Sequence, residues 1–527
     1  MAQGPFSLRD DYWETFEVEG EDIEFLYNYL LDKEIPLTSK ELVAALAEER
    51  IRQEKIAAEK KRKAVGATYF PKDTYQTGQT LVFPALKWRS GKVKQVRPGF
   101  NPDLGDFQVI QVAFDENDQR EFASGIQDHI LNNPPELAVD QPDLDLAVVL
   151  DTYSDTLLDS LEQTLEENDD FVRIAGKWFP RALLVDINVG HLNLAEAVLD
   201  MAGGGPASTV ELMEQIGLAE APNPKLTEFS LDLALQEDSR FDEVGPSGEV
   251  LWYLNRLEPE GVLKPHLCLR YHEIEYDRAL ITEKMLALER ELDDELSPFS
   301  GKYPHTAEVQ LALNFPHWRA GTLPLSGRVR HLFPTAYEAP RIRIILVDGE
   351  TGEKFPGWVV RTHRIVYGLR EWYQAKGIIP GSLIRIRRGA QPGEVIVQVD
   401  SRRSSREWVR TVLVGSDGGV VFVMLKQPVS TTYDERMTIA VPDPEALEQV
   451  WQTMQKDRVP FEKTVVNMVR ELAKLNPQSH VHASELYAAV NTVRRCPPGP
   501  LMALLVSRPW FIHVGDMHYR FDDSERE

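Results

Sequence analysis

Three stretches of this chain share one pattern: DFVRIAGKWF at 170–179, RFDEVGPSGEVLWY at 240–253 and WFIHVGDMHYRF at 510–521. Each begins near an aromatic residue, runs through polar residues to a glycine-centred turn and ends in a second aromatic cluster. Apolar residues that alternate on both sides of a glycine turn are typical of a β-hairpin. The sequence therefore predicts three related hairpins.

Short helical segments come directly before the second hairpin. LNLAEAVLDMAGG at 192–204 predicts a helix that ends in glycines, and PASTVELMEQIGL at 206–218 predicts a second helix capped by Ser208 or Thr209. LTEFSLDLALQED at 226–238 predicts a third, amphipathic helix. Three helices and a hairpin are the order of a winged helix-turn-helix, which usually handles nucleic acid but often binds only protein.

The third hairpin follows three predicted helices in the same order. Their sequences are FEKTVVNMVRELAKLNP at 461–477, HVHASELYAAVNTVRR at 480–495 and PGPLMALLVSRP at 498–509. The first hairpin has only LAVVLDTYSDTLLDSLEQTLEE, at 146–167, before it. We therefore expect this first copy to be incomplete and to belong with the module that follows it.

Both complete units, and the unit at 191–258 above all, resemble the HARE-type winged helix that is also found in the RNA polymerase delta subunit. The matching features are the helix ending in small residues, the PASTVELMEQIGL helix and the paired aromatics Phe241 and Trp252. The resemblance covers about a quarter of the chain and implies an association with transcription or with DNA-modification systems.

Length and composition indicate a multidomain α+β protein of the cytosol. A chain of 527 residues with 43% hydrophobic and 27% charged residues is long enough for several globular domains. The acidic N-terminal stretch is unlike a signal peptide, and no apolar run approaches the roughly 18 residues of a membrane span. Cys268 and Cys496 lie too far apart in sequence to form a zinc cluster by themselves.

Turn signals and changes of composition divide the chain at several points. A Pro- and Asp-rich linker is predicted at 131–145. The expected parts are a helical N-terminal region at 1–65, an SH3-like β-barrel at 66–132, a helical segment plus winged helix at 146–262, a connecting helix at 263–298, a basic β-module at 300–427 and a C-terminal winged helix at 440–527.

The distribution of charge singles out one of these parts. The net charge of −25 counts against general nucleic-acid binding, because phosphate contacts need Lys and Arg. Residues 301–410, however, hold 18 Lys and Arg against 9 Asp and Glu. An acidic protein with one basic module can still bind DNA through that module.

The basic module contains a second resemblance. At 357–399 a strand leads to a helix around Tyr367–Ala375, and GIIPGSLIRIRR then begins another strand. This order is similar to the B3-like DNA-binding pseudobarrel, and the similarity spans about 50 residues. If it holds, one group of basic residues lies near one side and a second lies on the returning strand; the residues are Arg361, His363, Arg364 and Arg370, then Arg385, Arg387 and Arg388.

A further basic group follows in SRRSSREWVR, which is interpreted as a linker: Arg402, Arg403, Arg406 and Arg410. The arginine fork suits phosphate and guanine edges, because it can donate two parallel hydrogen bonds. Aromatic residues interleave with the arginines and could stack bases: Trp358, Tyr367, Trp372 and Tyr373. The alternatives are that these aromatics form a core, that the arginines form a solvated rim, and that the SRRSSREWVR group is an exposed turn.

Catalytic and metal-binding patterns are missing from the sequence. It contains no P-loop, no GxGxxG after a strand, no HExxH and no GxSxG. His480 and His482 have no partners at metal-ligand spacing and are expected to be exposed. We therefore expect no enzyme activity, no cofactor and no bound metal.

The sequence thus predicts a non-enzymatic protein that binds DNA through residues 300–427 and is associated with transcription. The third predicted helix of the unit at 191–258 is acidic and has no Lys or Arg, so this unit is expected to contact protein more than DNA. The alternative is an interaction scaffold, or an accessory subunit of RNA polymerase or of a restriction or modification complex, without direct DNA contact.

Overall fold

The computed structural model is a mixed α+β chain with 14 α-helices and six sheets in its described part. The mixed α+β class expected from the sequence is therefore confirmed. The chain divides into two compact units, Met1–Val185 and Asp186–Glu527. Most of the expected linker at 131–145 lies outside the described residues, which are 11–65, 67–86, 89–101, 105–115, 118–132, 145–298, 303–336 and 339–526.

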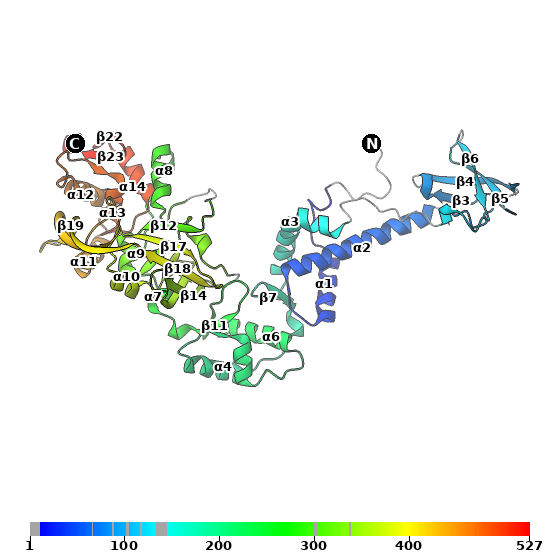
Figure 1. Ribbon diagram of the computed structural model, residues 1–527, viewed down its shortest axis with the longest axis horizontal. Coiled ribbons are helices and arrows are strands. Elements are labelled where there is room, and N and C mark those ends of the chain that lie inside the picture. Colours follow the sequence, from blue (N-terminus) through cyan, green and yellow to red (C-terminus); the bar gives the residue numbers. More distant parts are fainter. Residues whose placement is uncertain are drawn as a thin grey trace. The chain divides into compact units, whose positions relative to one another are not determined.

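The first unit contains a module of three helices and a three-stranded sheet (Figure 1). The helices are α1 (Gly20–Lys33), α2 (Ser39–Val65) and α3 (Leu146–Glu166). The strands are β1 (Leu37–Thr38), β7 (Phe171–Ile174) and β8 (Lys177–Pro180). Strand β8 lies in the middle, because it pairs with both β1 and β7.

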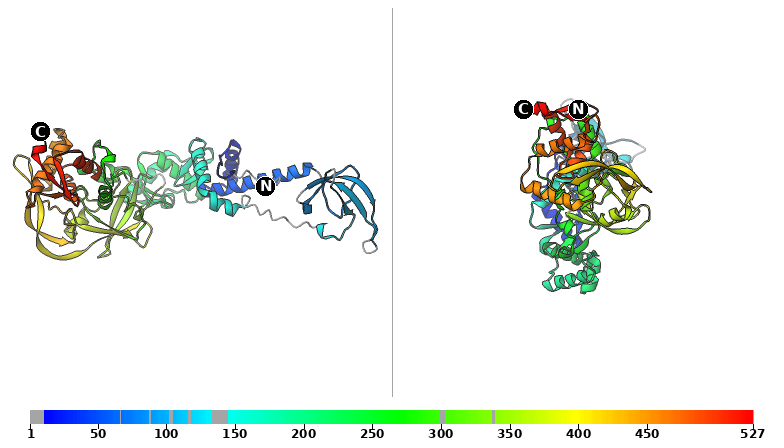
Figure 2. Two further views of the ribbon diagram at one scale, coloured as in Figure 1. Left: turned by 90° about the horizontal axis from the view of Figure 1, so that it is seen from above. Right: turned by 90° about the vertical axis from the view of Figure 1, so that its left-hand side faces the viewer.

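A five-stranded sheet is inserted between α2 and α3, and Figure 2 shows its strong curvature. Its strands follow one another across the sheet in chain order: β2 (Ala67–Thr68), β3 (Thr80–Phe83), β4 (Arg89–Pro98), β5 (Gln108–Ala113) and β6 (Gln119–Ser124). The sheet has a core of its own, in which the rings of Tyr69, Phe83 and Phe122 pack together. The likeness to an SH3 barrel remains a prediction.

The second unit begins with the same order of elements. The helices are α4 (Val189–Met201), α5 (Thr209–Ile216) and α6 (Pro224–Glu237). The strands are β9 (Ala207–Ser208), β10 (Phe241–Glu243) and β11 (Leu251–Leu254), with β11 in the middle of the sheet.

The C-terminal part repeats this arrangement. The helices are α12 (Phe461–Ala473), α13 (Ala483–Val490) and α14 (Pro498–Ser507). The strands are β21 (Val481–His482), β22 (Phe511–Gly515) and β23 (His518–Phe521), with β23 in the middle.

A shared cap begins the second helix of all three modules. The backbone N–H of the capping residue donates to a glutamate three positions later, in the pairs Thr38–Glu41, Ser208–Glu211 and His482–Glu485. Such reciprocal caps satisfy N–H groups that have no partner inside the helix. The imidazole of His482 accepts from the N–H of Ser484 and is only 3% exposed, so the expected exposure of His482 was wrong.

The first copy differs from the expectation in one important respect. Strand β1 pairs Leu37 with Trp178, so residues 146–185 belong with the N-terminal helices and not with residues 186–262. The copy has its three helices, but the five-stranded sheet separates the second from the third in sequence. The sequence pattern showed this copy as incomplete, because its second and third helices are about 80 residues apart in the chain.

Residues 263–298 are less helical than expected. Only α8 (Glu283–Leu292) and the end of the short helix α7 (Glu260–Leu263) are α-helical in this stretch. Two single 3₁₀ turns, Leu267–Leu269 and Arg278–Leu280, interrupt the chain before α8. The connecting helix predicted at 263–298 is therefore one helix of ten residues that follows an irregular segment.

A seven-stranded sheet curls into a half-barrel in the second unit (Figure 1). Its strands lie in the order β12-β17-β18-β14-β15-β16-β13, and of these neighbours β14 and β18 run parallel. Their bounds are β12 (Glu308–Ala312), β13 (Thr322–Pro324), β14 (Arg341–Asp348), β15 (Lys354–Val360), β16 (Ile365–Tyr367), β17 (Leu383–Arg388) and β18 (Glu394–Val399). Alternate side chains such as Ile384, Ile386 and Val397 fill its interior.

Two short helices lie at one end of the half-barrel. Helix α9 (Phe315–Ala320) joins the two edge strands β12 and β13, and α10 (Arg370–Lys376) joins β16 to β17. We call this the helix end. The opposite end, where β15 turns into β16 and where β17 finishes, is called the turn end.

After β18 the chain forms a long two-stranded ribbon, β19 (Ser401–Val414) and β20 (Val420–Thr431). Val412 and Phe422 of the ribbon pack into the same core as the C-terminal module and α11 (Pro444–Lys456). The segment 401–410, expected to be a linker, is thus the first part of a strand that spans two modules.

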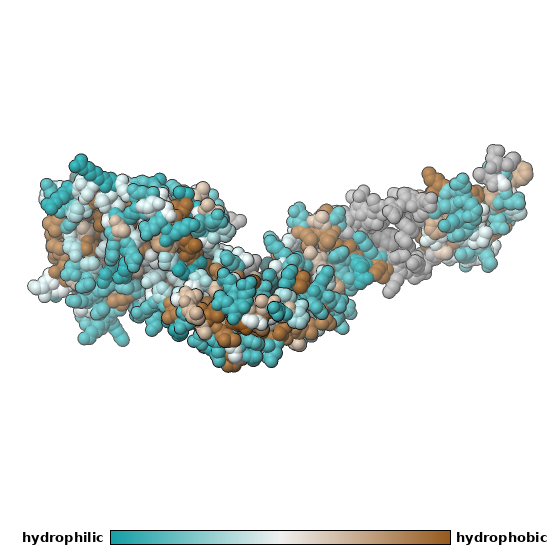
Figure 3. Space-filling view, turned by 60° about the horizontal axis from the view of Figure 1, so that its bottom comes forward, coloured by the Kyte–Doolittle hydropathy of each residue, from teal (hydrophilic) through white to brown (hydrophobic). Residues whose placement is uncertain are grey.

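In the described part of the chain, no helix combines the length and the apolar character needed to cross a membrane. Hydrophilic residues cover much of the face drawn in Figure 3, and smaller hydrophobic patches lie between them.

Candidate nucleic-acid interface

The structure divides the ten predicted nucleic-acid-binding residues among separate places. The three nearest the turn end are Arg361, His363 and Arg364, in the β15–β16 turn, and Arg388 closes β17 at the same end. Arg370 begins α10 at the helix end. Arg385 and Arg387 lie along β17, and the remaining three are at the start of the ribbon. They do not form one continuous cluster.

Backbone carbonyls hold the arginines at the two ends. Arg361 donates to the carbonyls of Ala336 and Ala339, over 3.0 and 3.3 Å. Arg364 donates to the carbonyl of Glu295 over 2.9 Å. Such bonds fix loops without neutralising the guanidinium charge.

Two further arginines are held in the same way, Arg370 by the carbonyl of Arg319 and Arg388 by that of His331. His363 is half-buried, and burial followed by the charge of Arg341 lowers the pKa of its imidazole. His363 is therefore a poor source of positive charge for phosphate contact.

The outer face of β17 carries Arg385 and Arg387, because Ile384 and Ile386 alternate with them and point into the core. Arg385 is paired with the carboxylate of Asp400. In the described part of the chain, Arg387 has no hydrogen-bond or ion-pair partner. Its cross-strand neighbours are Glu308 and Ile396, so one carboxylate-bearing residue stands beside it.

The ribbon holds the other three arginines. Arg402 pairs with Glu407 over 2.8 Å and stacks on the ring of Tyr433. Arg403 and Arg406 are exposed and have no ion-pair partner among the described residues. They are therefore available for contacts with phosphate.

Cross-strand pairing extends this basic surface along the ribbon. Arg406 stands opposite Pro428, and Trp408 stands opposite Lys426. Side chains two positions apart on a strand share a face, so Arg406, Trp408 and Lys426 point to the same side. The ammonium group of Lys426 lies 5.5 Å from the centre of the Trp408 ring. Arg403 lies at the irregular start of β19, where the register shifts, and its side chain is exposed. We call Arg406, Trp408 and Lys426, together with this neighbouring Arg403, the ribbon face.

Trp408 distinguishes the ribbon face from an ordinary solvated surface. Its side chain is 62% exposed, although an indole ring is usually more buried on average. Trp408 and Lys426 were not among the predicted residues. The alternating pattern of WVRTVLV and VVFVMLK could have identified the two strands, but not their pairing.

The predicted stacking aromatics of the half-barrel are mostly buried. Trp372 and Tyr373 belong to its core, whereas Trp358 packs against Tyr253 in a separate cluster. Trp358, Trp372 and Tyr373 are 3%, 7% and 2% exposed, and the hydroxyl of Tyr373 donates to the carbonyl of Thr322. Trp358 and Trp372 border a cavity of about 760 Å³, in which the guanidinium of Arg343 lies over the Trp358 ring. This burial favours a role of these aromatics in packing over a role in stacking bases.

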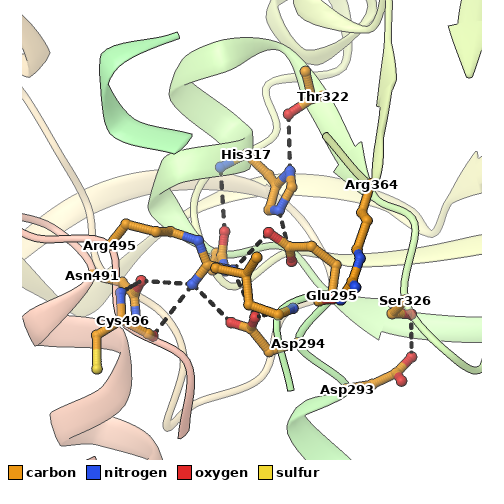
Figure 4. Close-up of polar contacts among 12 residues, drawn as sticks. Asp293, Asp294, Glu295, His317, Thr322, Ser326, Arg364, Asn491, Arg495 and Cys496 are labelled. Atoms are coloured by element: carbon orange, nitrogen blue, oxygen red, sulfur yellow. Dashed lines mark hydrogen bonds and ion pairs between the residues drawn. The ribbon is translucent and has the colours of Figure 1, made fainter. Parts of the chain in front are cut away.

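A buried ionic cluster joins the half-barrel to the C-terminal module (Figure 4). Arg495 donates to both carboxylate oxygens of Asp294, each over 2.7 Å, and to Glu295 over 2.7 Å. Glu295 also lies 3.2 Å from Nε2 of His317, whose Nδ1 is 2.9 Å from the hydroxyl of Thr322. Each of these charged side chains is at most 3% exposed, so the cluster has a structural role.

The electrostatics of the buried ionic cluster support its structural role. Burial by itself raises the pKa of the Glu295 carboxyl, but the charges and hydrogen bonds of Arg495 and His317 outweigh burial and hold that pKa well below its ordinary value. The phenol of Tyr487 donates to Asp294 and so completes the shell of the carboxylates.

One group of side chains has the composition of a metal site. The ligand atoms of His266, Cys268 and Glu448 lie within 4.8 Å of one another. Nδ1 of His266 already accepts from the N–H of Cys268, and Glu448 already binds Arg319 over 2.7 Å. Burial raises the pKa of the Cys268 thiol to about 12, which disfavours the thiolate that a metal would need. His266 and Glu448 therefore already have partners, and the neutral thiol of Cys268 is a poor metal ligand.

The third helices of the three modules are poor readers of DNA. Helix α3 and the exposed part of α6 carry acidic side chains, and α3 has no Lys or Arg. Helix α14 is almost wholly buried and packs against α8. Neither acidic charge nor burial is compatible with insertion into a groove lined by phosphates.

Searches with family models, among curated proteins and among solved structures found no match to this chain.

Proposed function

We propose that this protein binds duplex DNA through the ribbon face of β19 and β20, and that its three helical modules contact protein partners. The observation that carries the proposal is a two-stranded ribbon that presents Arg406 and Lys426 beside the solvent-exposed Trp408 on one face, with the exposed Arg403 at its irregular start. The major groove of DNA is wide enough to admit such a ribbon.

The charge of the ribbon supports this use. In a chain of net charge −25, residues 401–431 hold Arg402, Arg403, Arg406, Arg410 and Lys426 against Glu407 and Asp417. Two of these arginines are neutralised, Arg402 by Glu407 and Arg410 by Glu485. The other three cations have no carboxylate partner in the part of the chain that the structure describes. They can displace counterions from phosphates, and this release supplies a large share of the affinity for DNA.

The topology of the half-barrel is consistent with the B3-like resemblance. The resemblance rests on a helix that precedes the GIIPGS turn, and α10 ends directly before this turn, which leads into β17. The likeness therefore adds weight to DNA as the ligand of this module, with the ribbon and the outer face of β17 as its contacts.

A role of the helical modules in protein contact has separate support. In the module formed by α4, α5 and α6, several apolar side chains are exposed, among them Leu194 at 51%, Met201 at 91% and Val210 at 51%. Exposed apolar residues beside acidic helices favour a protein partner over a phosphate backbone. The HARE-type resemblance makes RNA polymerase or a modification complex the partner to examine first.

The decisive test compares two triple variants of the full chain that have equal net charge. In Arg403→Glu/Arg406→Glu/Lys426→Glu the ribbon face is reversed; in Lys225→Glu/Lys264→Glu/Lys284→Glu three exposed lysines elsewhere are reversed. Binding to a fluorescent duplex is measured by anisotropy across a salt series. The ribbon variant should lose about 100-fold in affinity at low salt and its log–log salt slope should fall by about 3, whereas the control should keep its slope.

Equal losses of DNA affinity in the two variants would contradict the proposal that the ribbon face is a dedicated DNA-binding surface. If the native chain does not bind the duplex even at low salt, the interaction-scaffold function is favoured over DNA binding. Capture of polymerase subunits from a native extract, lost on changing Leu194 and Met201 to Asp, would then support that function.

A further inference from the structure

The C-terminal part of the second unit contains a cavity that has a cationic wall. The cavity has a volume of about 340 Å³ and lies between the segment around Arg270, helix α11 and the residues after α13. Arg270, Arg458, Arg494 and Arg495 line it, together with the apolar side chains of Trp451 and Met454. No Asp or Glu is among its lining residues.

Three of the four arginines have no carboxylate partner in the described part of the chain. Arg494 donates to the carbonyl of Val459 over 2.9 Å, and its guanidinium lies 5.5 Å from the ring centre of Phe461. Arg270 donates to the carbonyl of Pro265 over 3.2 Å. Arg458 is exposed and no ion pair holds it. The charge of Arg495, by contrast, is balanced by Asp294 and Glu295.

The least solvated of the three is Arg494. It is half-buried, and burial lowers the pKa of its guanidinium. A guanidinium that has lost part of its water and faces no carboxylate is destabilising, unless an anion occupies the space beside it. The surrounding protein is acidic overall, so this local excess of positive charge is not a general property of the surface.

We propose that this cavity binds a small organic phosphate, a phosphate monoester joined to a flat or apolar group. Three uncompensated cations suit a dianion better than a monocarboxylate, and the arginine fork matches phosphate oxygens. Trp451 and Met454 provide an apolar wall for the rest of the molecule. The volume falls within the range of about 300–1,000 Å³ that small-molecule sites occupy. The proposal is independent of DNA binding by the ribbon.

Calorimetric titration of the full chain with adenosine monophosphate, inorganic phosphate, adenosine and citrate tests this proposal. Adenosine monophosphate should bind with a Kd below about 1 mM, more tightly than inorganic phosphate, and adenosine should not bind. Arg494→Met should raise the Kd at least tenfold. The double variant Arg270→Gln/Arg458→Gln changes only exposed side chains and should raise the Kd to a similar extent. This second variant keeps the test valid if Arg494→Met misfolds.

Matched controls separate this site from the ribbon. Arg330→Gln, another exposed arginine, and the ribbon triple variant should both bind adenosine monophosphate like the native chain. Absence of binding by either phosphate compound, or equal affinity in the native chain and the Arg270→Gln/Arg458→Gln variant, would overturn the proposal. Tighter binding of citrate than of adenosine monophosphate would contradict the proposal that the ligand is an organic phosphate.

Discussion

Trp178 donates its indole Nε1 hydrogen to the hydroxyl of Ser39 over 3.0 Å, although 139 positions separate the two residues in the chain. Ser39 in turn donates to the carboxylate of Glu162 over 2.6 Å. The second module has the same three-residue network, in which Trp252 donates to Thr209 and Asp232. The buried indole thus ties the middle strand to the second and third helices in two modules.

Removal of the Ser39 hydroxyl should destabilise the first module. Ser39→Ala leaves the buried Nε1 of Trp178 without its acceptor, which should cost about 1–3 kcal/mol of unfolding free energy. Urea unfolding of the full chain, followed by circular dichroism, measures the change. Thr156→Ala, at an exposed position on α3, is the control and should have almost no effect. An equal change in both variants would mean that the hydroxyl network has no special role.

Arg495 should be the most sensitive charged residue of the second unit. Arg495→Met leaves Asp294 and Glu295 buried without their cation, which should cost about 3–5 kcal/mol. The loss should be smaller when Glu295→Gln is also present, because one uncompensated charge is then absent. A double-mutant cycle by chemical denaturation measures this coupling. Strict additivity would contradict the direct pairing of the two side chains.

The ionic cluster also predicts loss of stability in acid. The pKa of Glu295 is lower in the folded chain than in the unfolded chain, so its contribution is fully present above its ordinary value of 4.5 and is lost as the pH falls below that value. Unfolding midpoints measured from pH 6 downwards should fall less steeply in Glu295→Gln than in the native chain. A slope that is unchanged in this variant would argue against the contribution of Glu295.

His482 predicts a second pH dependence, at a higher pH. Burial, with the charges of Arg436 and His518, lowers its pKa from 6.5 to about 4. Between these values the unfolded state binds a proton that the folded state does not, so stability should fall as the pH falls from 6.5 towards 4. Protonation would also remove the acceptor that caps α13. His482→Asn keeps a capping acceptor and should flatten the profile, whereas His513→Asn, at an exposed histidine, should not.

Trp408 should contribute to DNA affinity without affecting its salt dependence. Trp408→Ala removes an uncharged apolar surface that the groove would cover, so affinity should fall by about 1.5–3 kcal/mol while the log–log salt slope stays the same. Leu413→Ala, an exposed apolar residue on the opposite face of the ribbon, is the control and should bind normally. A changed slope in Trp408→Ala would indicate that the ribbon had been distorted.

The sequence alone was sufficient for several of the local elements. The alternation around Gly176, Gly248 and Gly515 predicted three hairpins, and the structure has them at β7–β8, β10–β11 and β22–β23, with Gly515 as the last residue of β22. The cap at Ser208 was recognisable, because hydrogen bonds within four residues determine where a helix begins. The locally basic composition of 301–410 was also visible without a structure.

Only the tertiary structure decided which elements belong together and which charges are free. Leu37 pairs with Trp178 across an inserted sheet, which no local pattern can reveal, because strand partners are chosen by packing and not by proximity in sequence. The sequence could not distinguish the ten predicted basic residues from one another. In the fold, carbonyls, Asp400 and Glu407 bind several of them, whereas Arg387, Arg403 and Arg406 have no hydrogen-bond or ion-pair partner among the described residues. Charge is a property of a residue, whereas its compensation depends on what the fold brings within a few ångströms of it.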